Sequence, residues 1–170
     1  MTPAVRIVQD DPLSEPVSTL LAEHLKHMRE ITPAGSVHAM DAQNLSSSSI
    51  TFWSAWFGNS LAGCGALLAL SKTDGEIKSM RTAREFRRRG VASSLLKHII
   101  DFARTNAYER LYLETGAGPA FKAAHDLYLG SRFQYCRAFG SYEPDGNSVY
   151  MTLDLASEPS SRSVNPKDGQ

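Results

Sequence analysis

The stretch from Glu85 to Ala103, EFRRRGVASSLLKHIIDFA, sets three arginines and a glycine directly before an apolar pattern with helical spacing. The N-terminus of a helix carries a partial positive charge, so cations gathered there cost stability unless an anion lies close by. First-turn amides without internal partners, next to a glycine and small side chains, bind phosphate oxygens well. The stretch therefore predicts a phosphate site, formed by Arg87, Arg88, Arg89, Gly90, Val91, Ala92 and Ser93. A solvated basic turn is the alternative.

Other phosphate-binding patterns fit less well. The Walker sequence GxxxxGK followed by Ser or Thr is absent. Residues 116–121, GAGPAF, begin like the dinucleotide motif GxGxxG but carry Phe121 in place of its third glycine. An arginine run could also contact nucleic acid, yet the chain has 18 basic and 18 acidic residues and no recognised nucleic-acid-reading helix. We therefore expect no nucleic-acid partner.

The composition is that of a soluble globular domain. The chain has 170 residues, of which 42% are hydrophobic and 21% charged, enough for one domain with its own core. The first residues lack the apolar region of a signal peptide, and no segment approaches the roughly 20 apolar residues of a membrane helix. Cys64 and Cys136 lie in apolar runs and are interpreted as buried free thiols, against a disulfide or a catalytic thiol. We expect a cytoplasmic protein with no membrane partner.

Hydrophobic periodicity and turn residues predict the element order β-α-(α)-β-β-β-α-β-α-β-β. Strands are expected at 4–9, in a hairpin over 50–70, and at 75–83, 110–115, 133–136 and 148–155. Helices are expected at 13–28, 91–106 and 119–130, with a short one at 41–45. The strand that follows the long helix can lie parallel to the strand before it, through a right-handed crossover. Residues 1–155 form one predicted domain, and 156–170, with Val164 as their core-forming residue, are expected to be a disordered tail.

Residues 87–92, RRRGVA, resemble the acyl-CoA signature Gln/Arg-x-x-Gly-x-Gly/Ala of the GNAT superfamily of N-acetyltransferases. GEIKSMRT and RLYLET resemble the family's fourth and fifth strands, and AAHDLYLGSRFQY resembles its pattern Ala-x-x-Leu-Tyr-x-x-x-Gly-Phe. The resemblance covers residues 75–136 and implies an α/β (α+β) fold, a mixed and mostly antiparallel sheet of six to seven strands with helices on both faces. Further segments, among them ITFWSAW and NSVYM, are similar to a bacterial branch labelled indole-acetate acetyltransferase, a label that is a poor guide to substrate.

The resemblance implies acetyl-CoA as co-substrate, with its pyrophosphate on residues 87–93 and its arm in the opening between strands 75–83 and 110–115. Contacts to the arm are expected from Met80, Arg81, Thr82, Phe121 and Ala124. The implied acceptor is an amine of a small molecule or a peptide. The resemblance implies no metal. Many members of the family are dimers, so a homodimer is compatible with the resemblance, but the sequence itself does not show the oligomeric state.

The sequence departs from the family pattern at two positions. Phe121 stands where the family often has an asparagine that contacts the cofactor arm. Arg132 stands where the family has a glycine before Phe133, so we expect Gly130 to cap the preceding helix instead.

Acetyl transfer to an amine needs a base for the amine proton and an acid for the departing thiolate. Glu76 is the first candidate for the base, because it lies eleven positions before Arg87, the spacing of the glutamate base in histone-acetyltransferase members. Strand alternation would place it on one face with Lys78, Met80 and Thr82. The alternative for Glu76 is an exposed cross-strand salt bridge, suggested by the neighbouring Lys78.

Three more residues are candidates, Glu114 because it points from the strand adjacent to that of Glu76, and Tyr128 and His38 by their place in the family's fold. Glu114 is the second candidate for the base, with a structural arginine pair as its alternative. Tyr128 matches the family's general acid, with a packed aromatic as its alternative. His38 lies in a loop where the fold builds its acceptor pocket, where it could bind substrate or act as a base; a plain loop histidine is the alternative.

Two other hypotheses bear on function. His24 and His27 lie three residues apart in the first helix, but no third ligand is evident, so we expect no metal site. A non-catalytic acyl-CoA-binding sensor is the second function hypothesis. Loss of the base and the acid would favour it, whereas Glu76 and Tyr128 are both present.

Overall fold

The structure is a computed structural model that describes residues 4–156. The expected disordered tail therefore lies outside the described residues, apart from its first residue. Within 4–156, no helix is long and apolar enough to cross a membrane.

Seven strands form one sheet in the order β1-β2-β3-β4-β5-β7-β6. The strands are β1 (Arg6–Gln9), β2 (Ile50–Phe57), β3 (Ser60–Ala69), β4 (Asp74–Thr82), β5 (Arg110–Gly116), β6 (Gln134–Cys136) and β7 (Ser148–Asp154). Neighbouring strands are antiparallel except β4 and β5, which are parallel. The predicted fold class is confirmed, and so is the crossover that makes β4 and β5 parallel.

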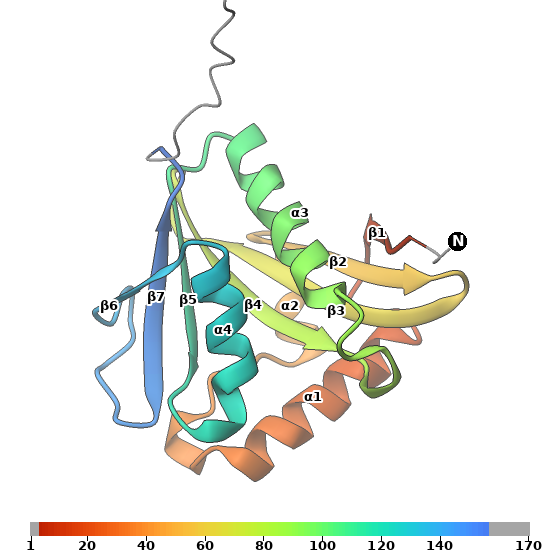
Figure 1. The fold of residues 1–170 in the computed structure, drawn as a ribbon, viewed down its shortest axis with the longest axis horizontal. Helices are drawn as coiled ribbons and strands as arrows, with labels where there is room; N and C mark the ends of the chain where they lie inside the picture. The colour runs from red at the N-terminus through yellow and green to blue at the C-terminus, as the bar shows by residue number, and fades with distance from the viewer. Residues whose placement is uncertain (1–3, 157–170) are drawn as a thin grey trace, which may run out of the picture.

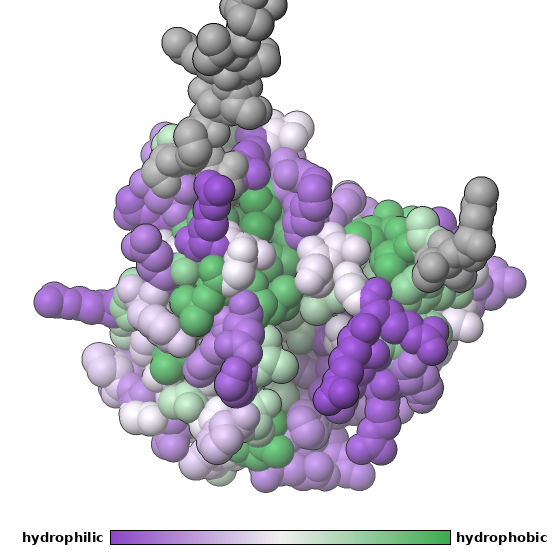
Figure 2. All heavy atoms as spheres, in the orientation of Figure 1, coloured by the Kyte–Doolittle hydropathy of each residue, from purple (hydrophilic) through white to green (hydrophobic). Residues whose placement is uncertain are grey.

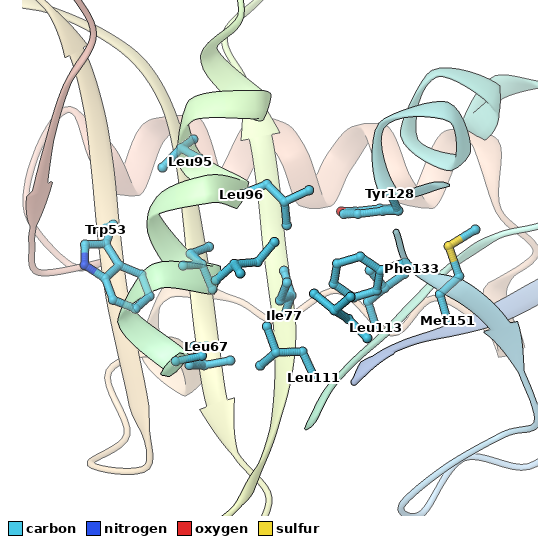
Figure 3. Close-up of a cluster of buried hydrophobic side chains, with 14 of the residues drawn as sticks. Trp53, Leu67, Ile77, Leu95, Leu96, Leu111, Leu113, Tyr128, Phe133 and Met151 are labelled. Carbon is cyan, nitrogen blue, oxygen red and sulfur yellow. The ribbon is translucent and has the colours of Figure 1, made fainter. Parts of the chain in front are cut away.

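Helices cover both faces of this sheet (Figure 1). The longer helices are α1 (Val17–Ile31), α3 (Val91–Thr105) and α4 (Lys122–Gly130); α2 (Ala42–Leu45) and three 3-10 turns (Ala34–Ser36, Arg84–Phe86, Pro119–Phe121) are short. The core under α3 and α4 contains Leu95, Leu96, Ile77, Leu113 and Phe133 (Figure 3). A second core joins α1 and α2 to the opposite face of β2 and β3.

Glycines in β3 allow α3 to lie close to the sheet. A Cβ built on Gly63 would lie 2.9 Å from a methyl group of Val91, and one on Gly65 would lie 2.6 Å from the sulfur of Met80. Both distances are shorter than a van der Waals contact, so any side chain at these positions would clash. The two glycines therefore fix how closely the start of α3 approaches β3 and β4.

Three local expectations differ from the structure. The first helix begins at Val17 rather than residue 13 and runs on to Ile31. The helix expected from Pro119 begins as a 3-10 turn, which passes into α4 at Lys122. Both cysteines are free, but Cys136 is only partly buried; burial raises the pKa of Cys64 to about 12, which makes that thiol a poor nucleophile.

The end of α4 also differs from expectation. Gly130 is the last helical residue, and the left-handed conformation is adopted by Arg132, at φ 71°. The amide of Phe133 donates to the carbonyl of Tyr128 and that of Arg132 to Leu129, each at 3.1 Å, which is a Schellman motif. The prediction that Gly130 would take over the cap was wrong, because Arg132 adopts the conformation usually given to glycine.

Candidate active site

The site opens where β4 and β5 separate. Their pairing runs from Asp74–Arg110 to Ile77–Leu113 and ends there, although β4 continues to Thr82 and β5 to Gly116. A cavity of about 380 Å³ lies at this opening, lined by both strands, α1, α4 and residues 32–39. The parallel pair therefore ends at the edge of a space that can hold a ligand.

A β-bulge changes which side chains of β4 enter this cavity. The pairing with β3 shifts between Cys64 and Ala66, and Ser79 has a positive φ of 56°. Beyond the bulge, Met80 packs with the core under α3, on the face opposite to Glu76 and Lys78. The expectation that Glu76, Lys78, Met80 and Thr82 share one face was wrong for Met80 and for Thr82, because the bulge resets the alternation. Thr82 pairs in register with Gly63, which faces Val91 and Leu95 of α3.

The predicted phosphate turn leads into α3. Gly90 is the N-cap residue in a left-handed conformation (φ 78°), and no atom comes within 4 Å of a Cβ built on it. No side chain caps this helix, and its first turn contains no acidic residue. Arg87 lines the cavity, Arg89 stacks its guanidinium 5.5 Å from the centre of the Phe86 ring, and hydrophilic side chains gather over the turn (Figure 2). The uncapped amides and cations fit a diphosphate.

The residues expected beside the cofactor arm line the same cavity: Met80, Arg81, Thr82, Phe121 and Ala124. Phe121 is the departure from the family pattern, and its ring lies against the backbone of Gly116. A Cβ on Gly116 would lie 2.1 Å from that ring. The aromatic side chain therefore depends on the glycine that ends β5.

Glu76 is almost fully buried and belongs to a three-residue network. Its Oε1 accepts hydrogen bonds from the hydroxyl of Tyr142 at 2.6 Å and from Nζ of Lys78 at 3.1 Å. Nζ of Lys78 also donates to the Tyr142 hydroxyl at 2.9 Å. The ion pair that the sequence suggested is present, but it is buried and lies within one strand, rather than exposed and across strands. Burial and the charge of Glu76 raise the pKa of Tyr142, so its hydroxyl remains a donor.

Glu114 and His38 lie at the same end of the cavity. Burial raises the pKa of Glu114, the carboxylate of Glu76 adds to this rise, and Lys78 opposes it. No arginine pairs with Glu114 anywhere in residues 4–156, so its expected structural alternative is absent there. The ring of His38 meets that of Tyr142 edge-on, with centroids 5.0 Å apart. Two carboxylates, those of Glu76 and Glu114, therefore line this end of the cavity.

Tyr128 lies on α4 at the other side of the opening. Its side chain is 6% exposed, lines the cavity and meets Phe133 with ring centroids 5.7 Å apart. Figure 3 shows its oxygen directed away from α4 toward the side where α3 lies. Burial, together with the charge of Glu114, raises the pKa of Tyr128, so the hydroxyl stays protonated and can donate.

Sequence reasoning missed Tyr142, which lies in the loop between β6 and β7. Its ring also packs against Phe139 and Tyr150. Asp145 accepts a hydrogen bond from Ser36, which ties this loop to the segment before His38. An aromatic residue in a late loop was the available signal, but nothing local in the sequence indicates that it reaches β4.

His24 and His27 line the cavity from α1. Among residues 4–156, no group of three or more His, Cys, Asp or Glu side chains is placed to hold a metal ion.

Comparisons with known proteins identify the family of this chain. A sequence model described as "Acetyltransferase (GNAT) family" matches residues 18–130. The uncharacterized N-acetyltransferase YsnE of Bacillus subtilis (strain 168) is 49% identical over 146 residues, which cover 86% of this chain and 97% of YsnE. An IAA acetyltransferase of Azospirillum brasilense is 33% identical, over 90% of this chain and 99% of that protein.

Solved structures share the fold. A Klebsiella pneumoniae protein described as an acyl-CoA N-acyltransferase superposes with a TM-score of 0.73 at 24% identity, over 89% of this chain and 97% of that one. A GNAT acetyltransferase of Elizabethkingia anophelis, solved with acetyl-CoA bound, gives 0.62 at 19% identity, over 88% and 97%. With the family match over more than half of its length, this chain belongs to the GNAT family of acetyltransferases.

Proposed function

We propose that this protein transfers the acetyl group of acetyl-CoA to an amine of a small molecule or peptide, by direct attack in a ternary complex. One observation carries the proposal. The uncapped start of α3, with its open Gly90, and the gap where β4 leaves β5 belong to one site that also holds carboxylates and a buried tyrosine hydroxyl. A diphosphate at residues 87–93 would leave the arm of acetyl-CoA to lie along Met80–Thr82, with its thioester near Ile77.

Glu76 is the proposed base. Both of its hydrogen bonds fall on Oε1, and Oε2 accepts none from residues 4–156, so one oxygen can take the amine proton. The amine nitrogen then forms a bond to the thioester carbonyl carbon, and the bond from that carbon to sulfur breaks. Glu114 and His38 would bind the acceptor beside it.

Tyr128 is the proposed acid. Its buried, protonated hydroxyl lies across the opening from Glu76 and can give its proton to the departing CoA thiolate. The proton that Glu76 receives and the proton that Tyr128 gives are both exchanged with water afterwards. The products are the acetylated amine and free CoA.

A panel of amines tests this proposal. Acetyl-CoA and each amine are incubated with the protein, and CoA thiol release and the acetylated product are both measured. The proposal expects amine-dependent product, with initial-velocity lines that intersect as both substrates are varied. Parallel lines would contradict direct transfer in a ternary complex. Acetyl-CoA binding without product from any amine would instead support the non-catalytic sensor.

A further inference from the structure

Two polar groups in the wall between α1 and β4 have no partner. Nδ1 of His24 and Nε of Arg81 are buried atoms without a hydrogen bond in the described structure. His24 is only 8% exposed, and both residues line the cavity. Oγ of Ser79, on the same strand as Arg81, is a third such atom at this cavity. Buried polar atoms are nearly always satisfied, so three of them around one cavity indicate a missing ligand.

The charges of the residues around these atoms indicate that the ligand is negatively charged. Arg81 lies within electrostatic reach of Arg87 and Arg84, with Glu23 the only carboxylate among its main neighbours. Burial is the main cause that lowers the pKa of Arg81, and Arg87 adds to it. An arginine held in a partly desolvated, mostly cationic wall costs free energy, which a bound anion would offset.

The bulge in β4 determines the face of the sheet to which the side chain of Arg81 points. Arg81 pairs in register with Cys64, and Lys78 pairs with Ala66, and both partners belong to the core under α1. The Arg81 side chain therefore points to the face that carries Glu76 and Lys78, whereas Met80 points to α3. The backbone of Arg81 stays available to the cofactor arm while its side chain faces the acceptor.

We propose that Arg81 and His24 bind a carboxylate of the acceptor, so that the acceptor is a small amine that carries an acid group. The amine end lies toward Glu76 and Glu114, and the carboxylate end toward α1. This inference rests on the proposed function and adds the substrate class to it. A phosphate of CoA has similar chemistry, and the experiment separates the two.

The test compares α-amino acids with their carboxamides, which differ in charge at one group. The ratio of kcat/KM for acid over amide is measured by CoA thiol release, for the wild type, Arg81→Met, Arg81→Lys and Arg84→Met. Arg84 is the matched control, because it is exposed and adds similar charge nearby without lining the cavity. Circular dichroism shows that each variant is folded, and calorimetry measures its affinity for acetyl-CoA.

We expect the wild type to favour acids by on the order of 10–100-fold, as a charge-assisted arginine contact can provide. Arg81→Met should reduce the ratio to about one to three, Arg81→Lys should keep part of it because it keeps the charge, and Arg84→Met should preserve it. Two results would overturn the subsite. One is equal kcat/KM for acids and amides in the wild type, and the other is a preference for acids that survives in Arg81→Met.

Three other results would also decide the matter. A raised KM for acetyl-CoA in Arg81→Met, with an unchanged acid preference, would assign the site to a CoA phosphate and overturn the acceptor subsite. Acetylation of none of the acids by a protein that still binds acetyl-CoA would overturn the subsite alone. A protein that binds no acetyl-CoA would overturn the proposed function, and the subsite with it.

Discussion

The hydroxyl of Tyr142 lies 2.6 Å from Oε1 of Glu76, although the two residues are 66 positions apart in the chain. The contact joins the loop before β7 to the strand that carries the proposed base. Lys78 donates to both residues, so the three side chains form a closed set.

Tyr142→Phe removes this hydrogen bond and keeps the ring between His38 and Tyr150. A hydrogen bond to a charged group contributes about 1.5–3 kcal/mol, so the free energy of unfolding should fall by about that amount. Urea denaturation of the wild type and the variant measures it. Tyr135→Phe is the control, because Tyr135 is 55% exposed and should change stability little. Equal stabilities of the wild type and Tyr142→Phe would mean that the network adds nothing to folding.

Glu76→Gln tests the base. If Glu76 takes the amine proton, kcat/KM should fall most near neutral pH, on the order of 10²–10⁴-fold, and recover in part as free amine forms at higher pH. Lys78→Met keeps the carboxylate and breaks the ion pair, which separates proton transfer from positioning. The measurement is the pH profile of all three proteins. An equal loss of kcat/KM at every pH would contradict the role of Glu76 as the base, and Glu114 and His38 would be the next candidates.

Tyr128→Phe keeps the ring and removes the proposed acid. The value of kcat should fall by on the order of 10–10³-fold, while KM for acetyl-CoA changes little, because the lost interaction is made mainly in the transition state. Steady-state and single-turnover rates check this. Full activity in the variant, with chemistry shown to limit the rate, would make Tyr128 a packing residue.

His24 makes stability depend on pH. Burial, reinforced by the positive charge of Arg81, lowers the pKa of His24 from 6.5 to about 4. As the pH falls below 6.5, the unfolded chain binds a proton that the folded protein does not bind until about pH 4. Stability is therefore lost across this window, by about 2–3 kcal/mol at about pH 4.5. In His24→Gln the loss between about pH 7.5 and about pH 4.5 should shrink by that amount in urea denaturation. An unchanged pH dependence would mean that His24 is protonated in the folded state.

Local signals in the sequence predict much of the fold. The helix expected at 91–106 is α3 (Val91–Thr105), because its apolar face is strongly periodic and Gly90 marks its start. The hairpin over 50–70 is β2 and β3, because the Gly58-Asn59 turn separates two apolar runs. These features depend on residues that are close together in the chain.

The site could be predicted only in part, because its geometry depends on distant contacts. The bulge at Ser79, which turns Arg81 toward α1, appears as ordinary alternation in the sequence. Tyr142 reaches Glu76 from a loop with no local pattern, and the unpartnered atoms of His24 and Arg81 exist only once α1 lies on β4. Composition and periodicity contain no information on such pairs.

Acetyl-CoA affinity after one substitution at the phosphate turn tests the central claim most directly. Gly90→Glu places a negative charge where the pyrophosphate is proposed to bind, and isothermal titration should show affinity for acetyl-CoA weakened by on the order of 100-fold or more. Gly58→Glu is the matched control, because Gly58 also has a positive φ (55°) and open space, in the β2–β3 turn. The account predicts near wild-type binding for Gly58→Glu and loss for Gly90→Glu. Wild-type affinity in a folded Gly90→Glu protein would contradict it.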